Sequence, residues 1–140
     1  MSFDLATFLP YQLAVVASRV SKSFAERYRG EFGLNISEWR VMAHLAHSEQ
    51  VSVREIHARV DMDKSKVSRA AGRLEARGLI EKREDTRDRR LVEMRLTEKG
   101  RAMMARIVPI ADAYQAELLQ TLADDAPAFR RILARLLEER

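Results

Sequence analysis

Apolar residues recur at spacings of three and four over residues 10–33, which predicts a long helix with one apolar stripe. Pro10 suits the first turn of this helix, because its missing N–H has no intrahelical partner there. Gly33 suits its end, since glycine readily adopts the left-handed conformation that follows many helices. The chain therefore opens with a helix that has one face to bury.

Three more helices are predicted between this helix and residue 78, each starting at a short polar residue that can accept a backbone hydrogen bond. Glu55 stands three residues after one such start and completes a capping box, whereas Arg40 at the corresponding place leaves the preceding box incomplete. Residues 51–53 form a short extended link. The predicted capping residues are Ser37, Ser52 and either Asp61 or Asp63.

Residues 80–84 and 91–96 are predicted to be two short strands around a polar turn, because apolar and polar positions alternate along the second. Thr97 can cap a fifth helix, and a sixth has Pro127 in its first turn. The expected fold class is mainly α with a small β-hairpin wing.

The helix after Asp61–Asp63 has one apolar side, and its other side carries short hydroxyls and long cations. These side chains reach phosphates and guanine edges in a major groove, so a DNA-recognition helix is predicted. An ordinary surface helix is the alternative. The predicted DNA contacts on this helix are Lys64, Ser65, Lys66, Ser68, Arg69 and Arg73.

The turn at residues 85–90 holds three Arg and two Asp and has neither Gly nor Asn, unlike most tight hairpin turns. Asp85 can accept hydrogen bonds from the turn or pair with a neighbouring Arg. Arg87, Arg89 and Arg90 then remain to enter a minor groove. The turn is therefore predicted to be a second DNA contact.

The charge distribution agrees with a polyanionic partner. Residues 62–95 hold 11 Lys and Arg against 7 Asp and Glu, so the net charge of +4 of the 140-residue chain resides in this segment. A solvated face of mixed charge is the alternative interpretation. The absence of cysteine excludes disulfides, thiolate nucleophiles and thiol redox sensors.

Catalytic and metal-binding patterns are weak. No Gly-rich phosphate loop and no spaced triad or dyad occurs, so the chain is predicted not to be an enzyme and to need no cofactor. His44 and His47 stand three residues apart, but further ligands at a convincing spacing are missing, so no metal site is predicted. Without a signal-peptide pattern or a long apolar run, a cytoplasmic protein without a membrane partner is expected.

The hairpin region and its flanks closely resemble the MarR family of bacterial transcription regulators. Residues 34–45, with Ser37 and Trp39, are similar to that family's second helix. The resemblance covers nearly the whole chain and is strongest over residues 52–100. The sequences that carry it best are residues 74–83, 85–90 and 96–100.

The resemblance implies a single domain, residues 1–140, that forms a homodimer. Residues 10–33 and 101–140 would dimerise, and residues 34–100 would form the winged helix-turn-helix. It implies a recognition helix over residues 64–77 and a wing in which Asp85 positions Arg87 near DNA. Two such helices in a two-fold dimer predict an inverted-repeat operator in double-stranded DNA.

The same resemblance implies a repressor that releases DNA when a small, often phenolic, ligand binds. An aromatic acid or its thioester is favoured, since the opening Leu9-Pro10-Tyr11 is weakly similar to regulators of aromatic-acid catabolism. Trp39 and Met42 can equally be core residues. The predicted ligand-binding residues are Tyr11, Trp39, Arg40, Met42 and His44.

Two other functions fit the same sequence. One is a DNA-compacting protein without a ligand switch, and the other is a protein-interaction module. Saturable, sequence-specific operator binding would separate the regulator from both.

Overall fold

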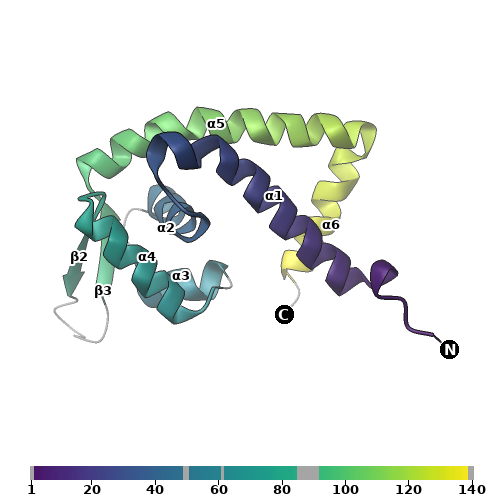
Figure 1. Cartoon of the computed structure of the whole chain (residues 1–140), viewed down its shortest axis with the longest axis horizontal. Helices are drawn as coiled ribbons and strands as arrows, with labels where there is room; N and C mark the ends of the chain where they lie inside the picture. Colours follow the sequence, from purple (N-terminus) through teal and green to yellow (C-terminus); the bar gives the residue numbers. More distant parts are fainter. Residues whose placement is uncertain (1, 49–50, 61, 85–91, 139–140) are drawn as a thin grey trace. The chain divides into compact units, whose positions relative to one another are not determined.

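The computed structural model describes residues 2–48, 51–60, 62–84 and 92–138 (Figure 1). Contacts divide the chain into two compact units, one ending at Ile107 and one starting at Val108, inside the fifth α-helix. The predicted fold class, mainly helical with a β-hairpin, is confirmed. The elements are η1 (Leu5–Thr7), α1 (Leu9–Phe32), α2 (Ile36–His47), β1 (Val51–Ser52), α3 (Val53–Val60), α4 (Lys64–Ala76), β2 (Ile80–Glu84), β3 (Val92–Leu96), α5 (Glu98–Leu122), η2 (Ala123–Asp125) and α6 (Ala126–Glu138).

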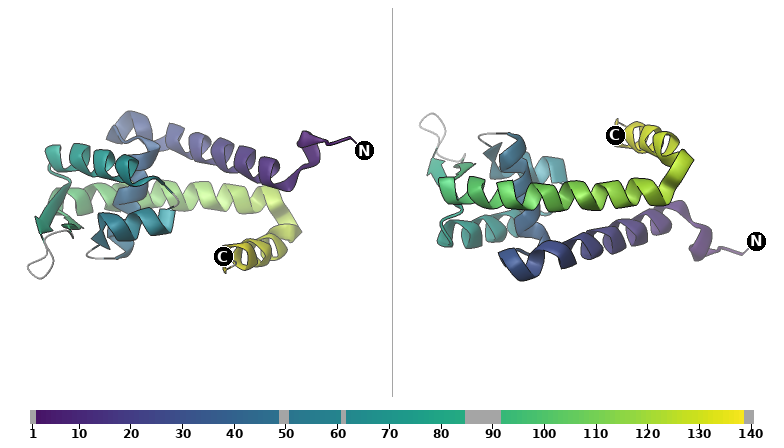
Figure 2. Two further views of the ribbon diagram at one scale, coloured as in Figure 1. Left: turned by 90° about the horizontal axis from the view of Figure 1, so that it is seen from below. Right: turned by 90° about the horizontal axis from the view of Figure 1, so that it is seen from above.

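The buried core of the described residues lies entirely in the first unit, between Ala25 and Ile107. Helix α2 packs against α3, α4 and β3, and the last turns of α1 also contribute buried side chains. Figure 2 shows α2, α3 and α4 gathered near the hairpin. The fully buried side chains of largest volume are Tyr28, Leu34, Met42, Ile56, Leu74, Leu79, Ile80, Met94 and Ile107.

The strands form a small antiparallel sheet in the order β1–β3–β2. In β2 and β3, Ile80 stands opposite Leu96 and Glu84 opposite Val92, so the strand predicted over residues 80–84 is confirmed. The extended link predicted at residues 51–53 instead contributes a two-residue strand that pairs with β3. This pairing attaches the start of α3 to the hairpin.

The cap of α2 differs from the prediction. Asn35, not Ser37, is the N-cap: its side chain accepts from the backbone N–H of Glu38 at 2.8 Å. The Glu38 carboxylate accepts in turn from the backbone N–H of Asn35 at 2.8 Å, so the capping box is complete. The helix therefore starts earlier than expected, because an Asn and a Glu three residues apart satisfy two free donors at once.

Three other predicted caps are confirmed. The Ser52 hydroxyl accepts from the backbone N–H of Glu55 at 3.1 Å, and the Glu55 carboxylate accepts from the backbone N–H of Ser52 at 3.4 Å. Of the two candidate caps for α4, Asp63 is the one described, accepting from the backbone N–H of Lys66. The Thr97 hydroxyl accepts from the backbone N–H of Gly100 at 3.1 Å in the first turn of α5.

Two helical segments leave large apolar side chains exposed. In the second unit, the apolar stripe of α6 is between 37 and 83% exposed, and none of its residues is buried. In the first unit, η1 and the first half of α1 do the same. The exposed apolar residues of these two segments are Phe3, Leu5, Phe8, Leu9, Tyr11, Leu13, Val16, Phe129, Ile132, Leu133, Leu136 and Leu137.

None of the described helices combines the length and apolar character needed to span a membrane.

Candidate nucleic-acid interface

Helix α4 separates its two faces sharply. Val67, Ala70, Ala71 and Leu74 are fully buried at spacings of three and four, against α2 and α3. The side facing away is exposed and polar, as the sequence predicted. The exposed residues on that side are Lys64, Ser65, Lys66, Ser68, Arg69 and Arg73.

The N-terminus of α4 is fixed by Asp63. One carboxylate oxygen of Asp63 accepts from the Ser65 hydroxyl at 2.7 Å and from the backbone N–H of Lys66 at 3.0 Å. These two hydrogen bonds hold the pKa of Asp63 below its ordinary value. Ser65 is thus held by the cap as a donor, and its oxygen still has lone pairs that can accept a hydrogen bond.

The C-terminal half of α4 is held by the α1–α2 corner, defined here as residues 32–38. Nε of Arg73 donates to Oε2 of Glu38 at 3.0 Å, and Glu38 is only 6% exposed. Arg77, directly after the helix, donates to the carbonyls of Phe32 and Gly33 at 2.9 and 3.1 Å. Arg73 therefore has only its two Nη nitrogens left for DNA. Sequence reasoning missed these contacts because 35 to 45 residues separate the partners.

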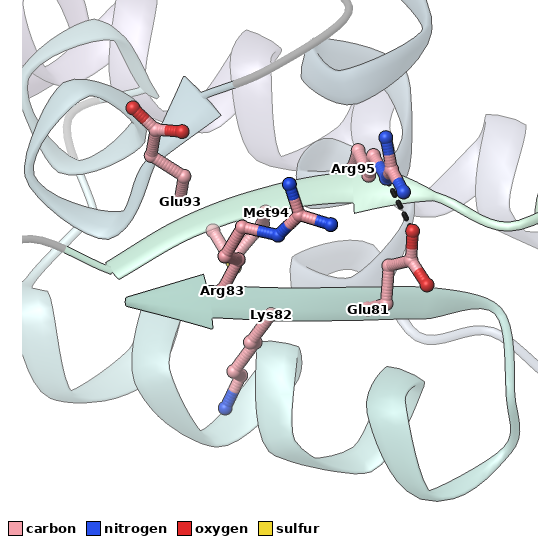
Figure 3. A pocket seen from close by; sticks show the side chains of 6 residues that line it. All are labelled: Glu81, Lys82, Arg83, Glu93, Met94 and Arg95. Atoms are coloured by element: carbon pink, nitrogen blue, oxygen red, sulfur yellow. Dashed lines mark hydrogen bonds and ion pairs between the residues drawn. The ribbon is translucent and has the colours of Figure 1, made fainter. Parts of the chain in front are cut away.

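The body of the hairpin carries balanced charge on one face. Glu81 stands opposite Arg95, with which it forms an ion pair, and Arg83 stands opposite Glu93. Figure 3 shows these side chains on one side of the strands. Lys82 lies on the other side and pairs with Glu75 of α4 at 3.7 Å. Because opposite charges face each other, this part of the hairpin has little net attraction for a phosphate backbone.

The predicted contacts of the wing tip, Asp85, Arg87, Arg89 and Arg90, lie outside the described residues. The four facing charges of the strands, with Lys82 and Met94, line a cavity of about 90 Å³ (Figure 3). Small-molecule sites commonly need roughly 300 Å³ or more and are mostly apolar. This cavity is therefore unsuited to an aromatic ligand.

An aromatic cluster joins α1 and α2. The ring centroids of Phe24 and Trp39 lie 5.2 Å apart, and that of Tyr28 lies 4.9 Å from Phe24 and 5.6 Å from Trp39. Burial raises the pKa of the Tyr28 hydroxyl, and its oxygen has no hydrogen-bond partner among the described residues. Unpaired buried polar atoms are rare and call for a water or ligand partner.

The other predicted ligand residues divide into two groups. Arg40 and His44 are half-buried on α2. Arg40 donates to the Ser21 hydroxyl at 3.4 Å, and Nδ1 of His44 is buried without a partner in the described part of the chain. Burial, then the charges of Arg59 and His47, hold the pKa of His44 below its ordinary value. A neutral imidazole in this position can donate or accept.

Met42 and Tyr11 do not join that group. Met42 is fully buried in the core, in agreement with the alternative interpretation of this residue. Tyr11 is 39% exposed and precedes Phe24 by 13 residues on α1. At 1.5 Å per residue this places the two about 20 Å apart along the helix. Within one chain, Tyr11 and Trp39 therefore cannot contact the same small ligand.

Comparisons with known proteins agree with this geometry. The model of the MarR family matches residues 32–91. A MarR family transcriptional regulator from Silicibacter pomeroyi DSS-3 is 31% identical, with a TM-score of 0.80 over 96% of this chain and 99% of that chain. The transcriptional regulator PapX of Escherichia coli is 27% identical over 97% of this chain and 85% of its own length.

A third relative is similar in fold. The structure of BpsR from Bordetella bronchiseptica has a TM-score of 0.85 over the whole of both chains, at 21% identity. DNA binding by BpsR is regulated by 6-hydroxynicotinic acid. The relatives found are transcription regulators and not enzymes. With the winged-helix arrangement of α3, α4 and the hairpin, they show that this chain is a transcription regulator of the MarR family.

Proposed function

We propose that the chain is a homodimeric repressor in the cytoplasm, that it reads an inverted-repeat operator, and that a small aromatic acid or its thioester releases it. The observation that carries the DNA-binding part is the division of α4 between a fully buried apolar face and an exposed face of hydroxyls and cations. Such a helix can dock its buried side on its own unit and offer its polar side to a major groove.

The proposed DNA contacts differ in kind between α4 and the wing. Short and long donors on α4 suit base edges, with Ser65 and Arg69 the main readers. Because the strands have balanced charge, attraction to the backbone and the minor groove would come from the arginines at the tip, held by Asp85. The full proposed set is Lys64, Ser65, Lys66, Ser68, Arg69, Arg73, Asp85, Arg87, Arg89 and Arg90.

Dimerisation is supported by the exposed apolar side chains of η1, the first half of α1 and α6. Apolar surface of this extent is uncommon on monomers and marks an interaction site. We expect an interface in the size class of obligate dimers, above roughly 2,000 Å² in total. The symmetry of such a dimer would place two copies of α4 on one side of the duplex, about one helical turn or a multiple of it apart.

Exchange of Arg69 for alanine is predicted to alter the sequence preference. The DNA would be a duplex enriched from a random pool by the wild-type protein. Loss of a bidentate base contact should weaken binding to that duplex by on the order of 10-fold or more and relax the preference at one position of each half-site.

Arg87→Ala is the matched comparison, since it also removes one arginine. It should weaken binding to the operator and to random duplexes alike and make the salt dependence of binding shallower, as expected for a lost phosphate contact. Fluorescence anisotropy at two salt concentrations measures both variants. If the two behave identically, the division between base reading and backbone attraction is wrong.

The ligand site is proposed at the aromatic cluster of α1 and α2. The half-buried rings of Phe24 and Trp39 could contact an aromatic ligand, and Arg40 could pair with its carboxylate. His44 adds a buried nitrogen without a partner in the described residues. To release DNA, the ligand must bind the non-binding dimer more tightly than the DNA-bound form.

A panel of hydroxylated aromatic acids and their thioesters should contain compounds that lower operator affinity at least tenfold. Trp39→Ala should abolish this response, since it removes the largest ring of the cluster. Isothermal calorimetry and anisotropy would test both statements. A panel that neither binds the protein nor shifts operator affinity would favour a regulator without a ligand switch, or a DNA-compacting protein.

A further inference from the structure

Two arginines attach the C-terminal end of α4 to the α1–α2 corner. Nη2 of Arg77 donates to the Phe32 carbonyl at 2.9 Å and Nη1 donates to the Gly33 carbonyl at 3.1 Å. One turn earlier, Nε of Arg73 donates to Glu38 at 3.0 Å. The two arginines thus contact the α1–α2 corner at two places: Arg77 at the end of α1 and Arg73 at the start of α2.

The acceptors at this corner are well suited to hold a guanidinium. The carbonyls that end α1 have no partners inside the helix, and the helix end carries partial negative charge. Gly33 has a φ of +65°, which ends α1 at this point. A planar guanidinium can donate to two neighbouring carbonyls at once, whereas a lysine ammonium lacks this forked geometry.

Glu38 is committed on both of its carboxylate oxygens. Oε1 accepts from the backbone N–H of Asn35, and Oε2 accepts from Arg73. The side chain is almost completely buried, so its charge needs both partners. Glu38 therefore takes part both in the cap of α2 and in the contact with α4. These two hydrogen bonds fix its carboxylate in one orientation.

The first part of α5 strengthens the same cluster. Nζ of Lys99 donates to the carbonyl of Arg77 at 2.9 Å. Arg106 donates to Glu31 at 2.8 Å, and its guanidinium carbon lies 5.1 Å from the centre of the Phe32 ring. The end of α1 is therefore held by α4 and by α5, all within the first unit.

We propose that Arg77, and Glu38 acting through Arg73, are positioning residues that fix the direction of α4 relative to α1 and thereby set its sequence discrimination. This inference rests on the proposed reading of DNA by α4. A helix of 13 residues is about 20 Å long, so a tilt of roughly 10° at one end moves the other by about 3 Å. Hydrogen bonds to base edges tolerate only a few tenths of an ångström.

The same hydrogen bonds connect α1 to the proposed DNA-reading helix α4. Helix α1 carries the exposed apolar residues proposed to face a second copy, and its last carbonyls hold Arg77. A change in the direction of α1 would therefore reach α4 directly through the corner. A DNA contact by Arg77 is the competing role, and it predicts a different result when the charge is kept.

The test uses the full-length chain, the duplex that the wild-type protein enriches from a random pool, and a random duplex. Arg77→Lys keeps the charge but loses the forked contact. We expect operator affinity to fall at least tenfold, with affinity for random DNA and its salt dependence unchanged. Arg101→Lys is the matched control, because Arg101 also donates to a backbone carbonyl, that of Leu96, without linking α4 to α1.

Glu38→Gln gives an independent test by the sign of its effect. The amide can still accept from Asn35, so the cap is retained, but the charge that holds Arg73 is lost. Simple electrostatics predicts tighter DNA binding when a negative charge is removed. The positioning role predicts weaker operator binding with unchanged or tighter random binding. Glu75→Gln, also in an ion pair but away from the corner, should leave operator binding no weaker.

Thermal unfolding of each variant establishes that the measurements are made on folded protein. Unchanged operator affinity in both Arg77→Lys and Glu38→Gln would overturn this inference and leave the proposed function standing. An equal loss on operator and random DNA, with a shallower salt dependence, would make Arg77 a phosphate contact and also overturn it. Failure of the wild-type protein to enrich any duplex would instead reject the proposed function, and the inference with it.

Discussion

Replacing Gly100 by alanine is expected to lower the free energy of unfolding by about 3 kcal/mol, because the added methyl group would collide with backbone. A Cβ at position 100 would lie 2.1 Å from the Leu79 carbonyl oxygen and 3.2 Å from Cδ2 of Leu96. The Leu79 carbonyl oxygen cannot easily move away, since it accepts a hydrogen bond from the backbone N–H of Thr97 at 3.0 Å. Thr97 also accepts from the backbone N–H of Gly100, which prevents α5 from moving away.

Gly72→Ala is the matched control with the opposite expected sign. Gly72 lies inside α4, and nothing lies within 4 Å of an added Cβ. Alanine there should stabilise the protein by about 0.5–1 kcal/mol, because glycine loses more backbone entropy on folding. Thermal unfolding followed by circular dichroism should show Gly100→Ala melting about 10 °C lower than wild type. Equal melting of Gly100→Ala and wild type would mean that the close approach does not exist.

The order and type of the main elements were predictable because local signals decide them. Apolar spacing of three and four identified the helices, and alternation identified the strands. The Ser52–Glu55 box and the Asp63 and Thr97 caps were equally local. The wrong prediction at Ser37 had the same origin: Asn35 and Glu38 form a complete capping signal in the sequence, but the prediction placed the start of the apolar pattern after Ser37.

Contacts between distant residues could not be predicted in this way. The exposed cations of α4 follow from helical periodicity, but the attachment of Arg73 to Glu38 and of Arg77 to α1 depends on packing across 35 to 45 residues. Likewise, Gly100 was prominent only as part of a family pattern. Its physical reason, close approach to Leu79, requires the sheet to be paired first. Tyr11 was predicted to share a ligand site with Trp39 because both side chains are aromatic. In the structure, 13 residues of α1 separate Tyr11 from Phe24, the ring that contacts Trp39.

A glutamate at Leu133 is expected to separate the dimer and thereby abolish high-affinity operator binding. Leu133 belongs to the apolar stripe of α6, which has no buried residue within the described chain. In a two-fold dimer the substitution occurs twice, and each buried carboxylate without a partner costs several kcal/mol. The dimer dissociation constant should therefore rise by on the order of 100-fold or more.

Ala134→Glu is the matched control, because it adds the same charge to the same helix outside the apolar stripe. It should leave the dimer intact. Sedimentation velocity at micromolar concentration reports the mass, and anisotropy with the enriched duplex reports binding. A monomer of Leu133→Glu should still bind random DNA weakly, because its cations on α4 remain, but it should lose the operator, since one half-site contact cannot replace two. A Leu133→Glu protein that stays dimeric and binds the operator as tightly as Ala134→Glu would show that α6 does not form the interface.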